Sequence, residues 1–557
     1  MSRLKKFDFG GFAQGYDSFS GSRSQVKNQE IPAIPGITQN VDLDENGSPK
    51  KRSGYQYYSA AMSPGFAVTG GKEFLTPGNV SVIAACGSSW WKCGNGTAVQ
   101  LPGATFTPNQ QTLFDQASGF LVGGNGVDPL SYTDGSTVTQ ITVNSINGYS
   151  PVFYNNRIYC IGPSGDRVYY SNTLKISNLS PGGTVNGVIQ EGSPTFTSVV
   201  SNLDFTNMFN TDLTQTPKLN AGFLVFNFGS GIKLKRLKVD GDQLWAYSSL
   251  QGFSSITPLN VNVDGTITHS VRRSVVGTEF PAANGLQKVQ QNDQYFFGGD
   301  NIYSRGEVQY YASARVTTQS GRIQSEMRSV SQDGKKDVAI GFYQNKVYVA
   351  YRSGGPFNNQ IIVQDRVLNA WSTPWIGIPC SFFIDYTDIN GSKHLLAGSS
   401  DPSRPYMLEL NVGLNDAGSP ITSAFETKSS DCNLEGQVKY AAFVDVFYQQ
   451  LSGTLDCEVI ADETTVIGTR SQQQQIVATG SAGVGSQLVG TFLVGQEFTP
   501  GSVTGAISYE GQFRIATNYK PYRRISVRFS NNRLNEQYKV NDAVVWFKEG
   551  SINTPLK

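Results

Sequence analysis

Acidic side chains are the first residues of this sequence that could do chemistry. Enzymes that hydrolyse glycosidic bonds use two carboxylates about 5 to 10 Å apart, one of them with a raised pKa. The candidates for such a pair are Asp293, Asp300, Asp365, Asp385 and Asp388. Most of them lie close to a Gly, Asn or Arg, which is typical of a solvated turn. We therefore expect structural aspartates and assign no catalytic residue.

The sequence contains few residues of the types that form metal-binding or nucleophilic sites. It contains only two histidines, His269 and His394, so a histidine zinc site or a Ser-His-Asp triad has almost nothing to build on. Among six cysteines only Cys86 and Cys93 are close, and their spacing matches no zinc motif. Phosphate-binding loops, nucleophile elbows and Cys-x-x-Cys pairs are also missing from the sequence. We predict reduced thiols, no metal, no cofactor and no enzymatic activity.

A run of basic residues could contact a phosphate backbone. It consists of Lys233, Lys235, Arg236 and Lys238. Strand alternation places Lys233 and Lys235 on one face and Arg236 and Lys238 on the other, unless a bulge intervenes. We therefore expect solvated side chains on an outer strand rather than a nucleic-acid site.

The composition favours short strands and turns. The 557 residues include 60 Gly and 24 Pro, and 11% are aromatic. Lys and Arg number 44 against 43 Asp and Glu, a net charge of +1, so no excess of positive charge is available to wrap DNA. The sequence shows no signal peptide and no apolar stretch of about 18 residues. We expect a protein made in the cytoplasm that does not span a membrane.

A repeated pattern of alternating strands and Gly or Asn turns runs from about residue 81 to residue 410. Two copies pass through tight Asn-containing turns, at Asn155-Asn156 and at Gln344-Asn345, where a positive φ closes a hairpin. About seven such units are visible. Units of this kind stack on one another because a single sheet cannot bury both of its faces. The pattern predicts a β-propeller of six to eight blades.

The predicted domain organisation has three parts. Residues 1–60 form an N-terminal arm and the first propeller strands, and residues 61–410 form the propeller, with a polar insertion near 175–220. Longer alternating strands follow a linker, so residues 411–557 are expected to form a β-sandwich-like platform domain.

Several motifs resemble tail β-propeller proteins of tailed bacteriophages. The N-terminal motif covers residues 28–33 (NQEIPA), 40–47 (NVDLDENG) and 51–55 (KRSGY), and two more cover residues 342–372 and parts of 427–440 and 522–525. The residues that carry the resemblance, all expected to be structural, are Asn40, Asp42, Gly47, Lys51, Arg52, Gly54, Tyr55, Asp365 and Trp371. The order of the motifs is more specific than any one of them.

The best-known members of that group are the nozzle, or tail-stabilisation, proteins of short-tailed phages. The resemblance implies a virion protein of the head-tail connection: a homohexameric ring below the portal and its adaptor, with tail fibres or tailspikes attached around it. Such a ring closes the channel before infection and opens for genome ejection, when double-stranded DNA passes through its lumen. It is assembled in the host cytoplasm and resides in the tail.

Two other functions are compatible with the same sequence. A carbohydrate-binding or glycan-hydrolysing propeller used for host attachment would place two opposed carboxylates in a pocket lined by tryptophan, and Trp90, Trp91, Trp371 and Trp375 could stack on sugars. Packing between blades explains these side chains more simply. The third possibility is a propeller scaffold in the tail hub of a long-tailed phage.

Overall fold

The computed structural model describes most of the chain. The described ranges are 4–172, 208–209, 211–212, 219–226, 231–473 and 511–550, apart from short gaps at 21, 28, 77, 143, 241–242, 251–252, 262–266, 275–278, 291–292 and 309–312. The predicted insertion near 175–220 lies almost wholly outside them. Within them, no helix is long and apolar enough to cross a bilayer.

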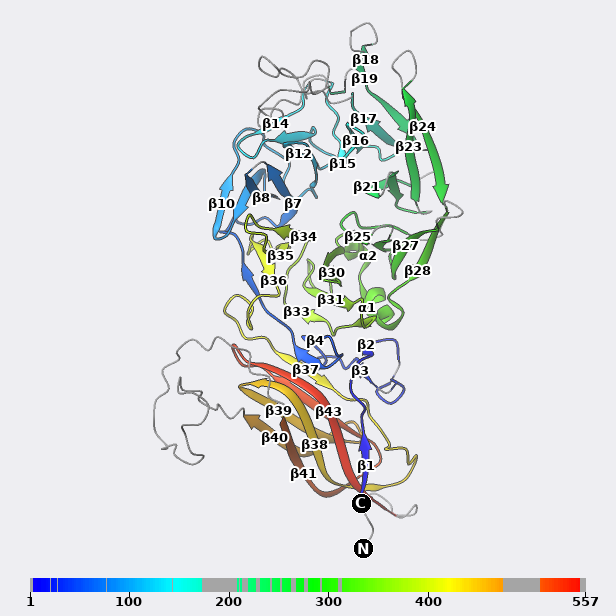
Figure 1. Ribbon diagram of the computed structural model, residues 1–557, viewed down its shortest axis with the longest axis vertical. Helices are drawn as coiled ribbons and strands as arrows, with labels where there is room; N and C mark the ends of the chain where they lie inside the picture. Colours follow the sequence, from blue (N-terminus) through cyan, green and yellow to red (C-terminus); the bar gives the residue numbers. More distant parts are fainter. Residues whose placement is uncertain are drawn as a thin grey trace, which may run out of the picture. The chain divides into compact units, whose positions relative to one another are not determined.

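The larger of two compact units consists of Tyr16–Gly21 and Ser53–Ser419. Its described residues form seven antiparallel sheets of four or more strands: six have four strands, and one carries additional strands. These sheets are arranged around a common centre in chain order (Figure 1). The unit is therefore a propeller of seven blades, within the predicted range, and the expected all-β class is confirmed.

The first three blades follow one another without rearrangement. Blade 1 comprises β7 (Val68–Thr76), β8 (Asn79–Cys86), β9 (Ser89–Gly94) and β10 (Thr97–Gln100). Blade 2 comprises β11 (Leu113–Ala117), β12 (Phe120–Gly124), β13 (Ser131–Thr133) and β14 (Val138–Gln140). Blade 3 comprises β15 (Tyr149–Tyr154), β16 (Arg157–Ile161), β17 (Arg167–Tyr170) and β20 (Gly222–Val225), and a separate hairpin of β18 (Thr211–Asp212) and β19 (Leu219–Asn220) precedes β20.

Three further blades continue the ring. Blade 4 comprises β21 (Leu234–Asp240), β22 (Gln243–Ser248), β23 (Phe253–Val261) and β24 (Ile267–Ser274). Blade 5 comprises β25 (Leu286–Gln290), β26 (Asp293–Phe297), β27 (Ile302–Val308) and β28 (Ser313–Thr318). Three short helices follow, η2 (Gly321–Ile323), α1 (Gln324–Ser329) and α2 (Gln332–Lys335). Blade 6 then comprises β29 (Ala339–Tyr343), β30 (Lys346–Tyr351), β31 (Gln360–Asp365) and β32 (Ala370–Trp371). Two more strands join this sheet: β33 (Trp375–Ile376) pairs with β31, and β2 (Gly15–Asp17) pairs with β32.

Blade 7 closes the ring with a strand from the other end of the unit. Its strands are β34 (Phe382–Thr387), β35 (Lys393–Gly398), β36 (Met407–Leu410) and β6 (Tyr55–Tyr57). Leu410 of β36 pairs with Tyr55 of β6. The innermost strand β34 packs against β7 of blade 1. The first and last blades are thus joined both at the centre and through the chain that leads from β6 into β7.

The propeller core lies between neighbouring blades. One cluster joins blades 1 and 2 through Ile83, Trp90, Phe114 and Leu121, and another joins blades 6 and 7 through side chains such as Trp375. Trp90 stacks on Phe106, with 5.0 Å between ring centroids. The side chains of Trp90, Trp371 and Trp375 are at most 2% exposed, so they pack blades together and do not form a sugar platform.

Both predicted Asn turns are present. Asn155 and Asn156 have φ of 47° and 58° and close the β15–β16 hairpin, and Gln344 and Asn345 have φ of 46° and 62° and close the β29–β30 hairpin. Two consecutive positive φ angles give the turn a twist that matches the twist of the strands on either side.

The second unit consists of Met1–Gly15, Ser22–Arg52 and Pro420–Lys557. One of its sheets has the order β4 (Val41–Leu43), β5 (Pro49–Lys51), β43 (Gln537–Glu549), β38 (Lys439–Ser452) and β41 (Gly511–Tyr522), with β1 (Lys5–Asp8) also on β43. The other has the order β37 (Ser423–Glu426), β42 (Ile525–Asn531), β39 (Thr454–Ala461) and β40 (Thr465–Gln473), and β3 (Glu30–Pro32) packs against β37. Phe425 of β37 stacks on Tyr538 of β43, so the sheets face each other as a sandwich.

This division places the N-terminal residues differently from the predicted domain boundaries. The residues predicted as an arm supply β1, β4 and β5 to the sandwich sheet, while β6 belongs to the propeller. The change of unit falls between Arg52 and Ser53, inside the KRSGY motif, and the chain returns to the sandwich at Pro420. The sandwich is therefore built from both ends of the chain.

The closing strand depends on a glycine. A Cβ placed on Gly54 would lie 1.8 Å from the backbone oxygen of Asn415. Gly54 also donates its N–H to the Gly413 oxygen at 3.0 Å, so the two segments cannot separate without losing this bond.

We expect Gly54→Ala to lower the free energy of unfolding of the propeller by about 3 kcal/mol, because the backbone of β6 must shift away from its partner. Chemical denaturation followed by tryptophan fluorescence measures this change. Gly321→Ala is the matched control, since a Cβ at Gly321 meets nothing within 4 Å. Equal stability of the two variants would contradict the role given to Gly54.

Candidate functional site

Four of the five candidate aspartates have structural partners. Asp293 forms an ion pair with Arg366 at 3.1 Å. Asp300 accepts a hydrogen bond from the Tyr303 hydroxyl at 3.4 Å. Asp365 and Asp388 each accept two backbone N–H groups of their own turns, and the side chain of Asp385 is exposed on β34. The contacts of the other four carboxylates fit the structural interpretation, and Asp385 is a solvated side chain.

The two histidines lie on different blades. The His269 Nε2 atom, on β24, lies 3.1 Å from the Tyr159 hydroxyl. The His394 Nδ1 atom, on β35, lies 2.5 Å from a Glu409 carboxylate oxygen. No group of three His, Cys, Asp or Glu side chains that could hold a metal occurs in the described part of the chain, and all six cysteines are free and buried.

The first group of signature residues stabilises the sandwich. Asn40, with φ of 57°, donates to the Thr422 oxygen at 2.7 Å and accepts from the Arg52 Nε atom at 2.8 Å. Lys51 is fully buried, and its ammonium donates to the Asn531 Oδ1 atom at 2.7 Å. A Cβ on Gly47 would lie 2.5 Å from the Cα of Ala13. The remaining member, Asp42, lies in β4 opposite Lys50.

The other signature residues belong to the propeller. Gly54 and Tyr55 lead into and form the closing strand, and Tyr55 is 3% exposed. Asp365 ends β31 and caps the following turn, while Trp371 donates its indole N–H to the Gln319 oxygen at 3.3 Å. The structure therefore uses these residues for folding and does not gather them into one site.

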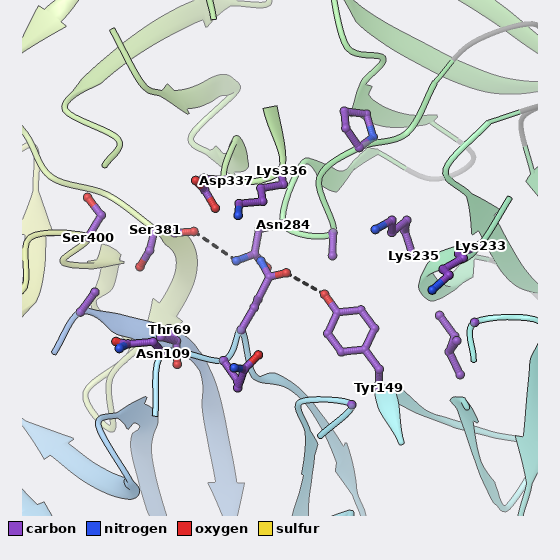
Figure 2. A pocket seen from close by; sticks show the side chains of 18 of the residues that line it. Thr69, Asn109, Tyr149, Lys233, Lys235, Asn284, Lys336, Asp337, Ser381 and Ser400 are labelled. Atoms are coloured by element: carbon purple, nitrogen blue, oxygen red, sulfur yellow. Dashed lines mark hydrogen bonds between the residues drawn. The ribbon is translucent and has the colours of Figure 1, made fainter. Parts of the chain in front are cut away.

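A cavity of about 550 Å³ lies on the propeller axis, where the innermost strands begin. Its lining comes from every blade or from the residue stretch just before it, and representatives are Thr69, Gly126, Tyr149, Lys235, Asn284, Asp337 and Ser381. Figure 2 shows labelled side chains of the lining, among them Thr69, Tyr149 and Asn284, converging from surrounding strands and loops. A volume of this size suits a small ligand.

Hydrogen bonds between blades hold the cavity wall in place. Asn284 donates its side-chain amide to the Ser381 oxygen at 3.1 Å, and Tyr149 donates its hydroxyl to Gln111 at 2.6 Å (Figure 2). The Ser381 hydroxyl donates to the Val68 oxygen at 2.5 Å. Blades 1 and 7 are thereby joined at the cavity rim.

The charged residues of the lining are mostly basic. They are Lys233, Lys235, Lys336 and Asp337. Burial lowers the pKa of Lys235, and the positive charges of Lys233 and Lys336 lower it further. Burial raises the pKa of Asp337, although Lys336 opposes that effect. The mouth of the axis is therefore positive, a property hidden by the net charge of the whole chain.

The expectation of solvated side chains on an outer strand was wrong for Arg236 and Lys238. They lie on β21, the first strand of blade 4, and a register shift between Leu234 and Arg236 interrupts the alternation. Apart from its neighbour Arg236, the charges that act on Lys238 come from Lys72 on β7, Asp115 on β11 and Lys288 on β25. These strands begin different blades, so Lys238 points toward the axis.

Sequence reasoning missed the cavity because its residues are spread over the whole propeller. The run of basic residues from Lys233 to Lys238 was a sequence signal for the cavity. It indicates the cavity only if a bulge changes which side chains face the axis. Alternation alone could not locate that bulge.

Solved structures with similar folds are β-propellers. The β-propeller domain of Cps50 (Swd1) from Myceliophteria thermophila is 9% identical, with a TM-score of 0.39 over 64% of this chain and 99% of that chain. U3-55K is 8% identical, with a TM-score of 0.38 over 64% and 98%, and the WD40 repeats of RRP9 are 8% identical, with a TM-score of 0.38 over 64% and 99%. The similarity concerns the fold alone. No protein-family model and no curated protein matches this chain.

Acid should destabilise the propeller through His269. Burial is the largest cause that lowers the pKa of His269 to about 4, and the charge of Arg157 adds to it. In the described structure its Nδ1 atom is buried without a hydrogen-bond partner. The unfolded chain therefore binds a proton more readily than the folded chain between about pH 6.5 and pH 4.

We expect stability to fall by about 1 to 2 kcal/mol as the pH drops through that range, since His269 is partly exposed and screening reduces the full effect. Thermal melts of wild type and His269→Gln at pH 7, 5.5 and 4.5 measure the difference. The control variant His394→Gln changes a histidine on another blade and should still show the fall in stability at low pH that is assigned to His269. An unchanged pH dependence in His269→Gln would exclude this assignment.

Proposed function

We propose that this chain is a structural protein of a bacteriophage tail, a nozzle-type ring below the portal and adaptor that closes the DNA channel and opens for genome ejection. The observation that carries the proposal is the ordered set of signature motifs, from residues 40–55 to Asp365 and Trp371. Most of these residues are buried, with Asn40, Lys51 and Arg52 inside the sandwich and Tyr55 and Trp371 inside the propeller, and they do not gather at one reaction centre. A structural role for the signature residues suits a protein that works by assembling with other subunits and moving, without catalysing a reaction.

The construction of both units supports a mechanical role. In the sandwich, β43 is hydrogen-bonded to β38 along nearly its whole length and also pairs with β1 and β5 near the other end of the chain. In the propeller, β6 and β36 are separated by about 350 residues of sequence and still form one sheet. Strands far apart in the sequence are therefore held together in one sheet in each unit.

The lumen for DNA would lie between subunits. The axial cavity of about 550 Å³ fits a small molecule and not a duplex. A ring in which one face of each subunit meets a different face of the next can enclose a wider opening. The proposed partners are other copies of this chain, the portal and adaptor proteins, and fibres or tailspikes, with DNA in transit.

A glycan hydrolase fits the cavity less well. Among the described residues, the lining contains one carboxylate, Asp337, and no tryptophan, whereas that function predicted two opposed carboxylates beside tryptophan. The carbohydrate function and the tail-hub scaffold are therefore outcomes for the test below.

The purified protein should form a sixfold ring, alone or once portal and adaptor are added, with a mass six times that of the 60.5-kDa chain. Light scattering gives the mass and negative-stain microscopy gives the symmetry. The reason is that a closed ring satisfies every heterologous interface.

A chain that stays monomeric with portal and adaptor, and binds or degrades host-surface polysaccharide, would replace this proposal with the carbohydrate function. Assembly only with baseplate proteins of a long-tailed phage would replace it with the hub scaffold.

A further inference from the structure

Basic side chains from several blades meet inside the propeller, beyond the cavity. They are Lys72 on β7, Arg236 and Lys238 on β21, and Lys288 on β25. Arg236 follows Lys235 of the cavity lining and interacts with Tyr149, which lines the same cavity. The group therefore lies next to the cavity, and its members come from three different blades around the axis.

The nearby carboxylates already have partners. Asp115 forms an ion pair with Lys72 and also accepts the Phe153 N–H at 2.7 Å. Asp240 forms ion pairs with Lys288 at 3.0 Å and with Arg305 at 2.7 Å. Two cations of the group, Arg236 and Lys238, form no ion pair with any described residue.

Arg236 shows an unmet need for hydrogen bonds. Its Nε and Nη1 atoms are buried and have no partner among the described residues. Buried N–H groups are almost always bonded to protein, to water or to a ligand. A guanidinium without an acceptor is costly, and a bound anion would remove that cost.

The charges around Lys238 also favour a bound anion. Burial is the main cause that lowers the pKa of Lys238 to about 8, and the positive charges of Arg236, Lys72 and Lys288 add to it, while Asp115 opposes it. Positive charges therefore outweigh negative ones around this ammonium group.

We propose that Arg236 and Lys238 bind an oxyanion of the sulfate or phosphate type inside the propeller. A guanidinium offers two parallel N–H donors to such an anion, and an ammonium adds a point charge. The positive cavity mouth, with Lys233, Lys235 and Lys336, attracts the anion from solvent. This proposal does not rest on the proposed role in the tail, so an experiment can contradict one of the two proposals and leave the other standing.

Binding should depend on pH through Lys238. Without an anion, this lysine loses its proton around pH 8. A bound anion favours the charged form and raises the pKa, so binding near pH 8.5 takes up a proton and weakens as the pH rises further. The other groups that face Lys238 are Lys72, Asp115, Arg236 and Lys288, and sulfate itself does not titrate in this range.

Isothermal titration of the full chain with sodium sulfate tests the site, with sodium chloride at equal ionic strength as the reference. We expect saturable binding at pH 7, weaker binding at pH 9, and proton uptake at pH 8.5 seen as a dependence on buffer ionisation enthalpy. Arg236→Gln and Lys238→Gln should each weaken binding by about tenfold or more. Lys393→Gln, an exposed lysine on β35, is the matched control and should bind as wild type does.

A second variant separates loss of binding from loss of folding. Lys238→Met removes a buried charge and keeps the length of the side chain, so its melting temperature without sulfate should equal or exceed that of wild type. Sulfate should then raise the melting temperature of wild type but not of Lys238→Met. The proposal is overturned if sulfate acts no differently from chloride on wild type, or if Lys238→Met and Arg236→Gln respond to sulfate as wild type does.

Discussion

A four-stranded sheet with apolar side chains on both faces is stable only between two neighbours. Every other feature of the larger unit depends on this constraint. It explains why large aromatic side chains such as Trp90, Trp371 and Trp375 are buried, and why blade 7 must contact blade 1. Because β6 completes blade 7 and the chain then runs into β7, no blade is left with an uncovered face at the join. The cavity follows from the same arrangement, since seven inner strands around an axis leave space at its end.

Local patterns predicted the fold class well. The Asn155-Asn156 and Gln344-Asn345 turns were visible because a tight hairpin needs particular residues at adjacent positions. The blade boundaries were less accurate, since the first unit was read from residue 81 although blade 1 begins at Val68. The strands Gly222–Val225 and Leu234–Asp240 lie close together in the sequence, yet they are the last strand of blade 3 and the first strand of blade 4. Alternation identifies strands but not the sheet to which each belongs.

Long-range features could not be read in this way. Nothing near Lys5 or Lys50 indicates that these strands pair with β43 at the far end of the sequence. The position of Lys238 depended on a bulge and on which strand lies nearest the axis. A net charge of +1 likewise describes the whole chain and not its interior, where buried Lys51 and Arg52 help to build the sandwich. The motif around these two residues was recognised, but its use as the junction between units required the structure.

The closing strand also sets the order in which the molecule can be made. β6 leaves the ribosome early, but its partner β36 ends at Leu410, and synthesis of the intervening chain takes tens of seconds. During that time six blades can stack, while β6 stays without its partner strand. The sandwich waits longer, because β1 and β5 need β43, which ends at Glu549. Both units therefore remain incomplete until late in translation, and a truncated chain would expose strand edges in each of them.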